Sequence, residues 1–90
     1  VIEIFKGEYN KEKNLVQLQW EYTESDILEY WIYKNKKEEG PSLFKQLSAA
    51  VYTYEDKDIL SNKEYTYYIK AIRQDGRESK LSKAVVIASN

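Results

Sequence analysis

The sequence predicts an all-β domain, built as an antiparallel sandwich of seven short strands. Stretches in which apolar and polar residues alternate recur along the chain of 90 residues, and short polar turns separate them. No long stretch has the apolar spacing of an amphipathic helix. A strand with this alternation buries one face and exposes the other, and a series of such strands is typical of two packed antiparallel sheets.

The strands are expected, in chain order, at residues 1–6, 15–21, 29–34, 43–47, 51–55, 65–73 and 82–88. The first is a β-prone run that leads into a polar, charged connection over residues 7–14. The second shows the clearest alternation, because Val16, Leu18 and Trp20 share one face while the residues between them are polar.

The third strand is unusual because it carries aromatic rings on both faces. If Tyr30 and Ile32 face the core, then Trp31 and the following tyrosine, Tyr33, project from the opposite face. An exposed charged turn follows. The fourth segment can be a short edge strand or a single helical turn, and we favour the strand.

The last three strands hold the strongest fold signals. The fifth is rich in β-branched and aromatic residues. The sixth alternates from Tyr65 to Ala71, and the polar turn before it contains Asn62, a residue type that tolerates left-handed backbone. Asp75-Gly76 then predicts a hairpin between the sixth and seventh strands.

Tyr65 stands at the start of a strand, directly after a polar turn. A tyrosine in this place can bury its ring and return its hydroxyl group to the backbone upstream. This arrangement is the tyrosine corner of immunoglobulin-like sandwiches.

With these features the chain resembles a fibronectin type III domain over nearly its whole length. Five features carry the resemblance. They are the core tryptophan at Trp20, the third-strand motif at 30–34, the end of the fifth strand with the plug of the next loop at 54–59, the corner tyrosine with its strand at 65–71, and the entry to the last strand at 76–82. It implies an immunoglobulin-like β-sandwich with a three-stranded sheet packed on a four-stranded sheet.

Composition excludes several classes of function. Ninety residues are enough for one domain, over 1–90, with one core. The absence of cysteine leaves neither a disulfide framework nor a thiolate metal site. Basic and acidic residues are interspersed and give a net charge of −1, so we expect no nucleic-acid binding. The apolar runs are far shorter than the roughly 18 residues that span a bilayer, so we expect no membrane insertion.

Catalysis is not indicated. The chain has no histidine and no cysteine, which leaves carboxylate chemistry as the obvious route. The densest acidic group is Glu55, Asp56 and Asp58. It could form a carboxylate pair or a calcium site, but we favour a solvated strand end in which Asp56 caps the next turn. We therefore expect no enzyme activity, no metal site and no cofactor.

One surface feature could carry binding. In the sheet order that the resemblance implies, the third and sixth strands are neighbours, so Trp31, Tyr33 and Tyr68 would form an exposed aromatic platform. Such a platform can stack on sugar rings or on a neighbouring domain. Alternatively, the rings only pair across the strands and stabilise the sheet, with the stems of Lys34 and Lys70 covering them.

Two functions follow as expectations. The first is a non-catalytic accessory module for spacing, domain docking or weak binding, within a larger secreted or surface-attached bacterial protein such as a carbohydrate-active enzyme. The alternative is an adhesion or receptor-like module that binds a protein or a glycan through the aromatic face. The expected partners are neighbouring domains, a polysaccharide or another protein, and the expected location is extracellular or at the cell surface.

The isolated chain is expected to be a monomer, because lysines around the edge strand at 43–47 discourage pairing between edges. It starts within a strand pattern and without an initiator methionine, so we expect it to be a piece of a multidomain protein.

Overall fold

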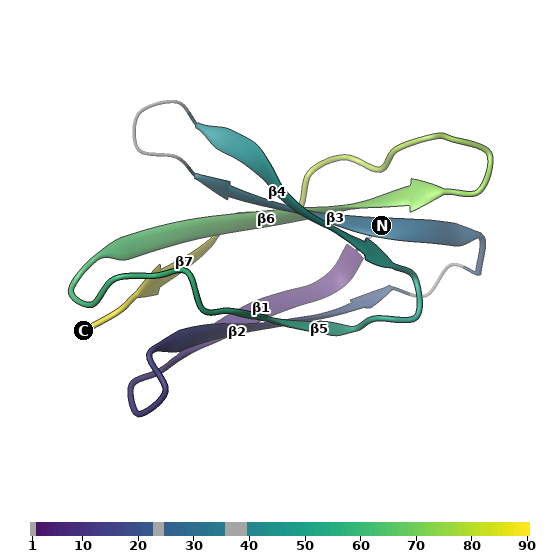
Figure 1. Ribbon diagram of the computed structural model, residues 1–90. Helices are drawn as coiled ribbons and strands as arrows, with labels where there is room; N and C mark the ends of the chain where they lie inside the picture. Colours follow the sequence, from purple (N-terminus) through teal and green to yellow (C-terminus); the bar gives the residue numbers. More distant parts are fainter. Residues whose placement is uncertain (1, 23–24, 36–39) are drawn as a thin grey trace.

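In a computed structural model, which describes residues 2–22, 25–35 and 40–90, the chain folds into two antiparallel β-sheets packed face to face (Figure 1). The strands are β1 (Ile2–Asn10), β2 (Leu15–Tyr22), β3 (Ile27–Asn35), β4 (Pro41–Ser48), β5 (Thr53–Asp56), β6 (Glu64–Arg73) and β7 (Val85–Ala88). One sheet has the order β1-β2-β5 and the other the order β4-β3-β6-β7. The seven-stranded, three-on-four sandwich that the sequence predicts is therefore confirmed.

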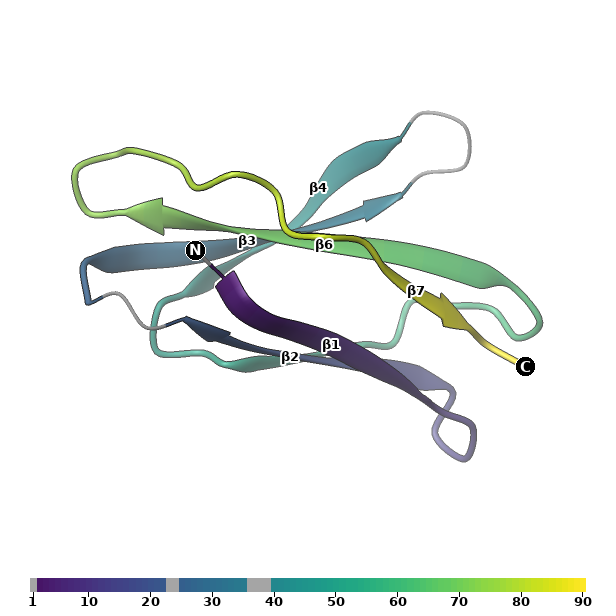
Figure 2. The same ribbon diagram turned by 180° about the vertical axis from the view of Figure 1, so that it is seen from behind.

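The edge strands differ most from their expected bounds. The segment that could have been a helical turn lies in β4, which pairs with β3 at one edge of the four-stranded sheet. The interpretation as a strand was correct. The last strand begins only at Val85, three residues later than expected, and the view from behind shows the irregular segment that precedes it (Figure 2).

The core lies between the sheets and is filled from both. Trp20 is 2% exposed, and its ring centroid lies 5.7 Å from that of Tyr30 in an edge-to-face arrangement. The other buried apolar residues of the core cluster are Val16, Leu18, Ile27, Ile32, Ile59, Tyr67, Ile69, Ala71 and Ile87. The alternations read in the second, third and sixth strands thus give the correct inward faces.

Two serines explain the late start of β7. The backbone amide of Ser79 donates to the Ala71 carbonyl, and the amide of Ser82 donates to the Ile69 carbonyl. In return, the hydroxyl groups of the two serines accept the amide hydrogens of Ala71 and Ile69 at 2.8 and 2.9 Å. The two serine hydroxyl groups therefore accept the β6 amide hydrogens that carbonyls of a neighbouring strand would otherwise accept. Regular pairing of β6 with a strand is not needed at these positions.

The turns use the residues that were expected. Asn62 has φ of 60° and Gly76 has φ of 88°, both in the left-handed region that asparagine and glycine tolerate best. The amide of Arg77 donates to the Asp75 carboxylate at 3.0 Å, which tightens the turn after β6. Asn14 also adopts positive φ, at 51°, in the connection between β1 and β2.

Candidate binding surface

The structure brings the three predicted aromatic residues to the outer face of the four-stranded sheet. Tyr33 on β3 lies directly opposite Tyr68 on β6, and Trp31 lies opposite Lys70. All three rings are partly exposed. The placement follows from alternation, because their neighbours Ile32 and Ile69 are fully buried in the core.

Trp31 is fixed in orientation by its own strand. Its indole nitrogen donates a hydrogen bond of 3.2 Å to the carboxylate of Glu29, two residues earlier on the same face. On the other side of β3, Gln46 of β4 is its direct neighbour. The indole therefore lies beside a carboxylate and an amide, both of which can bond polar ligands.

Tyr33 is partly covered by a lysine. The Lys70 ammonium lies 5.2 Å from the centre of the Tyr33 ring and 2.8 Å from the Glu78 carboxylate. The hydrogen bond to Glu78 is the main reason why the pKa of Lys70 is raised, since it stabilises the charged form. The alternative interpretation, in which the rings only stabilise the sheet, expected lysine stems to cover them. For Tyr33, Lys70 provides such a cover.

The covering by Lys34 that the same interpretation expected is wrong, because Lys34 lies on the core side of β3. Its ammonium is 2.7 Å from Oδ2 of Asp56, and only 14% of its side chain is exposed. It also lies 4.8 Å from the ring centres of both Phe44 and Tyr65. Lys34 therefore joins the interior and cannot cover the outer rings.

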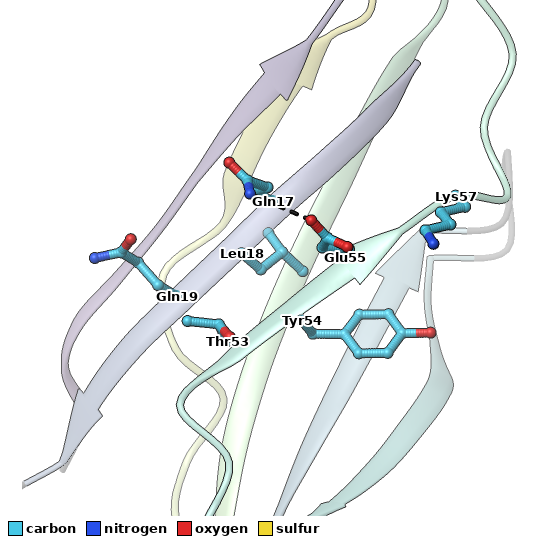
Figure 3. A pocket seen from close by; sticks show the side chains of 7 residues that line it. All are labelled: Gln17, Leu18, Gln19, Thr53, Tyr54, Glu55 and Lys57. Carbon is cyan, nitrogen blue, oxygen red and sulfur yellow. Dashed lines mark hydrogen bonds between the residues drawn. The ribbon is translucent and has the colours of Figure 1, made fainter. Parts of the chain in front are cut away.

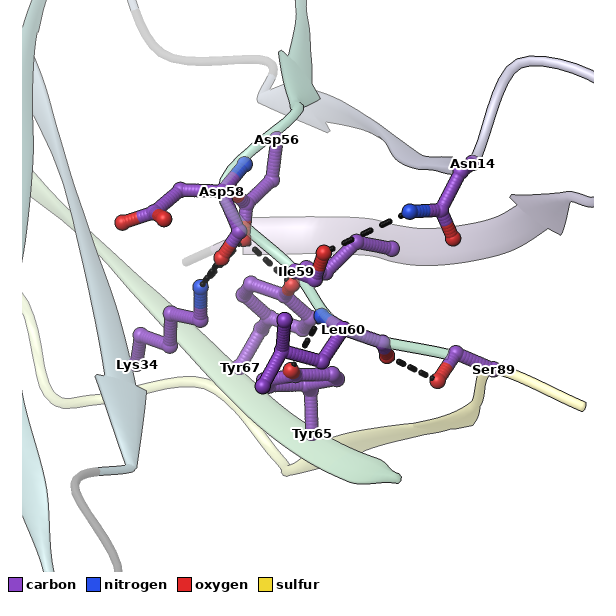
Figure 4. A network of polar contacts seen from close by, with 9 residues as sticks. All are labelled: Asn14, Lys34, Asp56, Asp58, Ile59, Leu60, Tyr65, Tyr67 and Ser89. Atoms are coloured by element: carbon purple, nitrogen blue, oxygen red, sulfur yellow. Dashed lines mark hydrogen bonds and ion pairs between the residues drawn. The ribbon is translucent and has the colours of Figure 1, made fainter. Parts of the chain in front are cut away.

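Around Asp56 the structure forms a polar network that sequence reasoning missed (Figure 4). Asp56 is 1% exposed. Its carboxylate accepts hydrogen bonds from the Tyr67 hydroxyl at 2.6 Å and from the amide of Asp58 at 2.9 Å. The expected cap on the following turn is thus present, but the expected solvated strand end is not. Lys34 lies two residues after Ile32 and four after Tyr30, so the alternation along β3 places it on the core face. This was the signal in the sequence that could have revealed the network.

Burial is the largest cause of the raised pKa of Tyr67, and the hydrogen bond to Asp56 adds to it. Both effects favour the neutral phenol. Of the expected acidic group, Glu55 and Asp58 are exposed while Asp56 is engaged in the interior. Within residues 2–22, 25–35 and 40–90, no group of three or more potential metal-ligating side chains gathers.

The tyrosine corner is formed by Tyr65, as expected. The backbone amide of Leu60 donates to the Tyr65 hydroxyl oxygen at 2.7 Å, so the hydroxyl group acts as the acceptor (Figure 4). At the same loop, the buried hydroxyl oxygen of Ser89 lies 2.6 Å from the Leu60 carbonyl and 2.9 Å from the Lys63 carbonyl, so its single hydrogen is shared between the two acceptors. The end of the chain is thereby tied to the loop before β6.

An open depression lies over β2 and β5, at the edge of the three-stranded sheet (Figure 3). Its lining includes Gln17, Gln19, Thr53, Glu55 and Lys57. The Gln17 amide donates to the Glu55 carboxylate at 3.3 Å. The Glu55 carboxylate is thus already engaged by a neighbouring surface side chain.

The described part of the chain contains no helix with the length and apolar character needed to cross a membrane.

No family model and no curated protein matches the sequence. Solved structures do match. An Fn3-like protein from Clostridium thermocellum aligns over 93% of this chain and 85% of its own, with a TM-score of 0.78 and 16% identity. The third fibronectin III domain of a human protein aligns over 98% of this chain and 79% of its own, with a TM-score of 0.75 and 12% identity.

A third match is the pectate lyase Pel3 from Pectobacterium carotovorum, with a TM-score of 0.79 and 14% identity. The alignment covers 92% of this chain and 25% of the lyase, so the chain spans about a quarter of that protein's length. Together with the strand order and the corner tyrosine, these matches identify the architecture. The chain has the fold of a fibronectin type III domain.

Proposed function

We propose that the chain is a non-catalytic accessory module of a larger secreted or surface-attached bacterial protein, in particular a carbohydrate-active enzyme. The observation that carries the proposal is the pectate lyase match, in which a unit of this fold accounts for 25% of a longer chain. Fold likeness at 14% identity does not transfer an activity. It does provide a precedent for this fold within a polysaccharide-degrading protein.

The shape of the domain supports a spacing role. Its extents are 40 × 27 × 18 Å, so it is elongated. The beginning of β1 and the end of the chain lie well apart along the long direction (Figure 1). A rigid sandwich with this layout would hold two flanking segments at a set separation, with neighbouring domains as its partners.

The side-chain chemistry supports a non-catalytic role. Without histidine or cysteine, catalysis would depend on carboxylates. Among the residues whose burial is described, Asp56 is the most buried carboxylate, and it already accepts bonds from Tyr67 and the Asp58 amide and pairs with Lys34. A group so fully engaged is poorly suited to accept a proton from a substrate.

The proposal is tested with the 90-residue chain and with the gene that encodes it. The purified chain should release no reducing sugar and no unsaturated uronide from a panel of plant and bacterial polysaccharides that includes polygalacturonate. Turnover that scales with protein concentration and survives repurification would overturn the non-catalytic assignment. A carbohydrate-active catalytic domain in the same reading frame is the result expected for an accessory module.

A second candidate is an adhesion or receptor-like module at the cell surface. The observation that favours it is the gathering of Trp31, Tyr33 and Tyr68 on one outer face. Tandem copies of the domain or a membrane anchor in the same reading frame would support this candidate instead of the accessory module. Both candidates place the chain outside the cell.

A further inference from the structure

We infer that the outer face of the four-stranded sheet binds a neutral polysaccharide, with Trp31 as the main stacking ring and Tyr68 as a second. The inference rests on the chain being a binding module, the second candidate above, and an accessory module can also have such a face. Four observations carry it.

The first is the fixed orientation of Trp31. The bond of 3.2 Å to Glu29 restrains the indole along β3 before a ligand arrives. A ligand that stacks on a fixed ring does not have to immobilise it, and this lowers the entropic cost of binding. A tryptophan needed only for packing would gain little from this anchor at a partly exposed position.

The second is the position of Tyr68 relative to Trp31. Tyr68 lies opposite Tyr33, the residue two places after Trp31, so the two rings are diagonal neighbours across β3 and β6. Such neighbours are about 7–8 Å apart between their backbones. Two rings that start from such neighbouring backbone positions can engage different parts of an extended ligand. Tyr33 contributes less, because Lys70 already occupies its face.

The third is the set of polar groups around the rings. Gln46 lies beside Trp31 on β4, and Thr66 precedes Tyr68 by two residues on the same face of β6. An amide, a hydroxyl group and the Glu29 carboxylate can exchange hydrogen bonds with sugar hydroxyl groups. Apolar ring faces with a polar border match a pyranose, which has apolar C–H faces and a polar rim.

The fourth is charge. Glu29 and Glu78 are acidic, and Lys70, the cation in contact with the aromatic set, is already paired with Glu78 at 2.8 Å. In this local set of three charged side chains, Glu29 and Lys70 contact the rings and Glu78 contacts Lys70, so two are acidic and one is basic. A polyanion such as polygalacturonate would meet repulsion here, while an uncharged glycan would not.

The test is affinity electrophoresis of the 90-residue chain in native gels that contain one polysaccharide each. The neutral probes are a soluble β-1,4-glucan, a β-1,3-glucan and a galactomannan, and the anionic probe is polygalacturonate. We expect slower migration with at least one neutral glycan and unchanged migration with polygalacturonate. Migration that is unchanged in all three neutral gels, or slowed only in polygalacturonate, would overturn the inference.

Substitutions locate the site. Trp31→Ala and Tyr68→Ala should each weaken the retardation, with about a tenfold or larger loss of affinity for Trp31→Ala. Trp31→Phe keeps a ring and should retain part of the binding. Tyr52→Ala is the matched control, because Tyr52 is 58% exposed and lies outside this sheet.

Thermal unfolding of each variant separates lost binding from lost folding. If Trp31→Ala does not fold, Tyr68→Ala and Trp31→Phe carry the same test. Binding that persists undiminished in folded Trp31 and Tyr68 variants would overturn the assignment of the face. A negative result here leaves the accessory role standing, whereas polysaccharide turnover by the chain would overturn that role and not this one.

Discussion

The Lys34 ammonium lies 2.7 Å from Oδ2 of Asp56, and this ion pair joins the two sheets of the sandwich. Lys34 belongs to β3 in the four-stranded sheet, and Asp56 ends β5 in the three-stranded sheet. Tyr67 of β6 donates to the same carboxylate oxygen. A buried charge of this kind is tolerable only because each of its partners is in place.

Replacement of Lys34 should therefore be strongly destabilising. Lys34→Ala leaves the Asp56 carboxylate in the interior without its counter-charge, and removal of one partner of a buried pair typically costs about 3–5 kcal/mol. The free energy of unfolding can be measured with urea, using tryptophan fluorescence as the signal. Lys11→Ala, at an exposed position in the turn after β1, is the control and should change stability by less than about 0.5 kcal/mol. Equal effects of the two changes would contradict the structural role of the pair.

Removal of the Tyr67 hydroxyl group should weaken the same network from the other side. Tyr67→Phe keeps the buried ring but deletes a hydrogen bond to a charged acceptor, a change worth about 1.5–3 kcal/mol. Urea unfolding at neutral pH measures the difference from the unaltered chain. A double variant with Lys34→Ala should show a smaller loss than the sum of the single changes, because both act on one carboxylate.

Tyr67 should also make stability depend on alkaline pH. Its pKa is raised in the folded chain above the ordinary value of 10.0, chiefly by burial. Below that value both states hold the proton and the contribution is fully present. As the pH rises above it, the unfolded state loses the proton first, and stability falls. The stability advantage over Tyr67→Phe should therefore shrink between neutral pH and about pH 11. If the difference in unfolding free energy between the two proteins stays constant over this pH range, the pKa of Tyr67 is not raised in the folded chain.

The tyrosine corner predicts a smaller effect for Tyr65. Tyr65→Phe removes the acceptor of the Leu60 amide, and a neutral hydrogen bond of this kind contributes about 0.5–1.5 kcal/mol. Amide hydrogen exchange at Leu60 should become faster, because the loop loses its fixed contact to β6. Tyr52→Phe is the control, as that ring is 58% exposed. Unchanged exchange at Leu60 would show that the hydroxyl contact does not hold the loop.

The inward faces of the strands were predictable because burial repeats every two residues. Trp20 and Ile69 occupy the core as their alternation requires, and the same rule places Trp31 and Tyr68 outside. The interior of the network was not predictable in the same way. Lys34 was assigned to the surface because it is a lysine, although the alternation along β3 places it on the core face. Its partner Asp56 is distant in sequence. Such a pairing depends on how one sheet lies on the other.

The start of the last strand was mispredicted for a related reason. Regular strand pairing was expected from residue 82, but Ser79 and Ser82 satisfy β6 with their hydroxyl groups instead. Hydrophobic alternation carries no information about a side chain that replaces a backbone carbonyl. The two serines, separated by two residues, became meaningful only when their partners on β6 were known.

These serines give the last prediction. Ser79→Ala removes the acceptor of the Ala71 amide, and Ala71 is fully buried. An amide left without a partner in such a place costs about 1–3 kcal/mol. Hydrogen exchange of the Ala71 amide should accelerate more than the change in global stability explains, since this edge of β6 opens locally. Ser42→Ala, at an exposed position of β4, is the matched control and should leave both quantities unchanged. If the Ala71 amide stays as protected in Ser79→Ala as in the control, the hydroxyl group is not its partner, and regular pairing must extend further along β6.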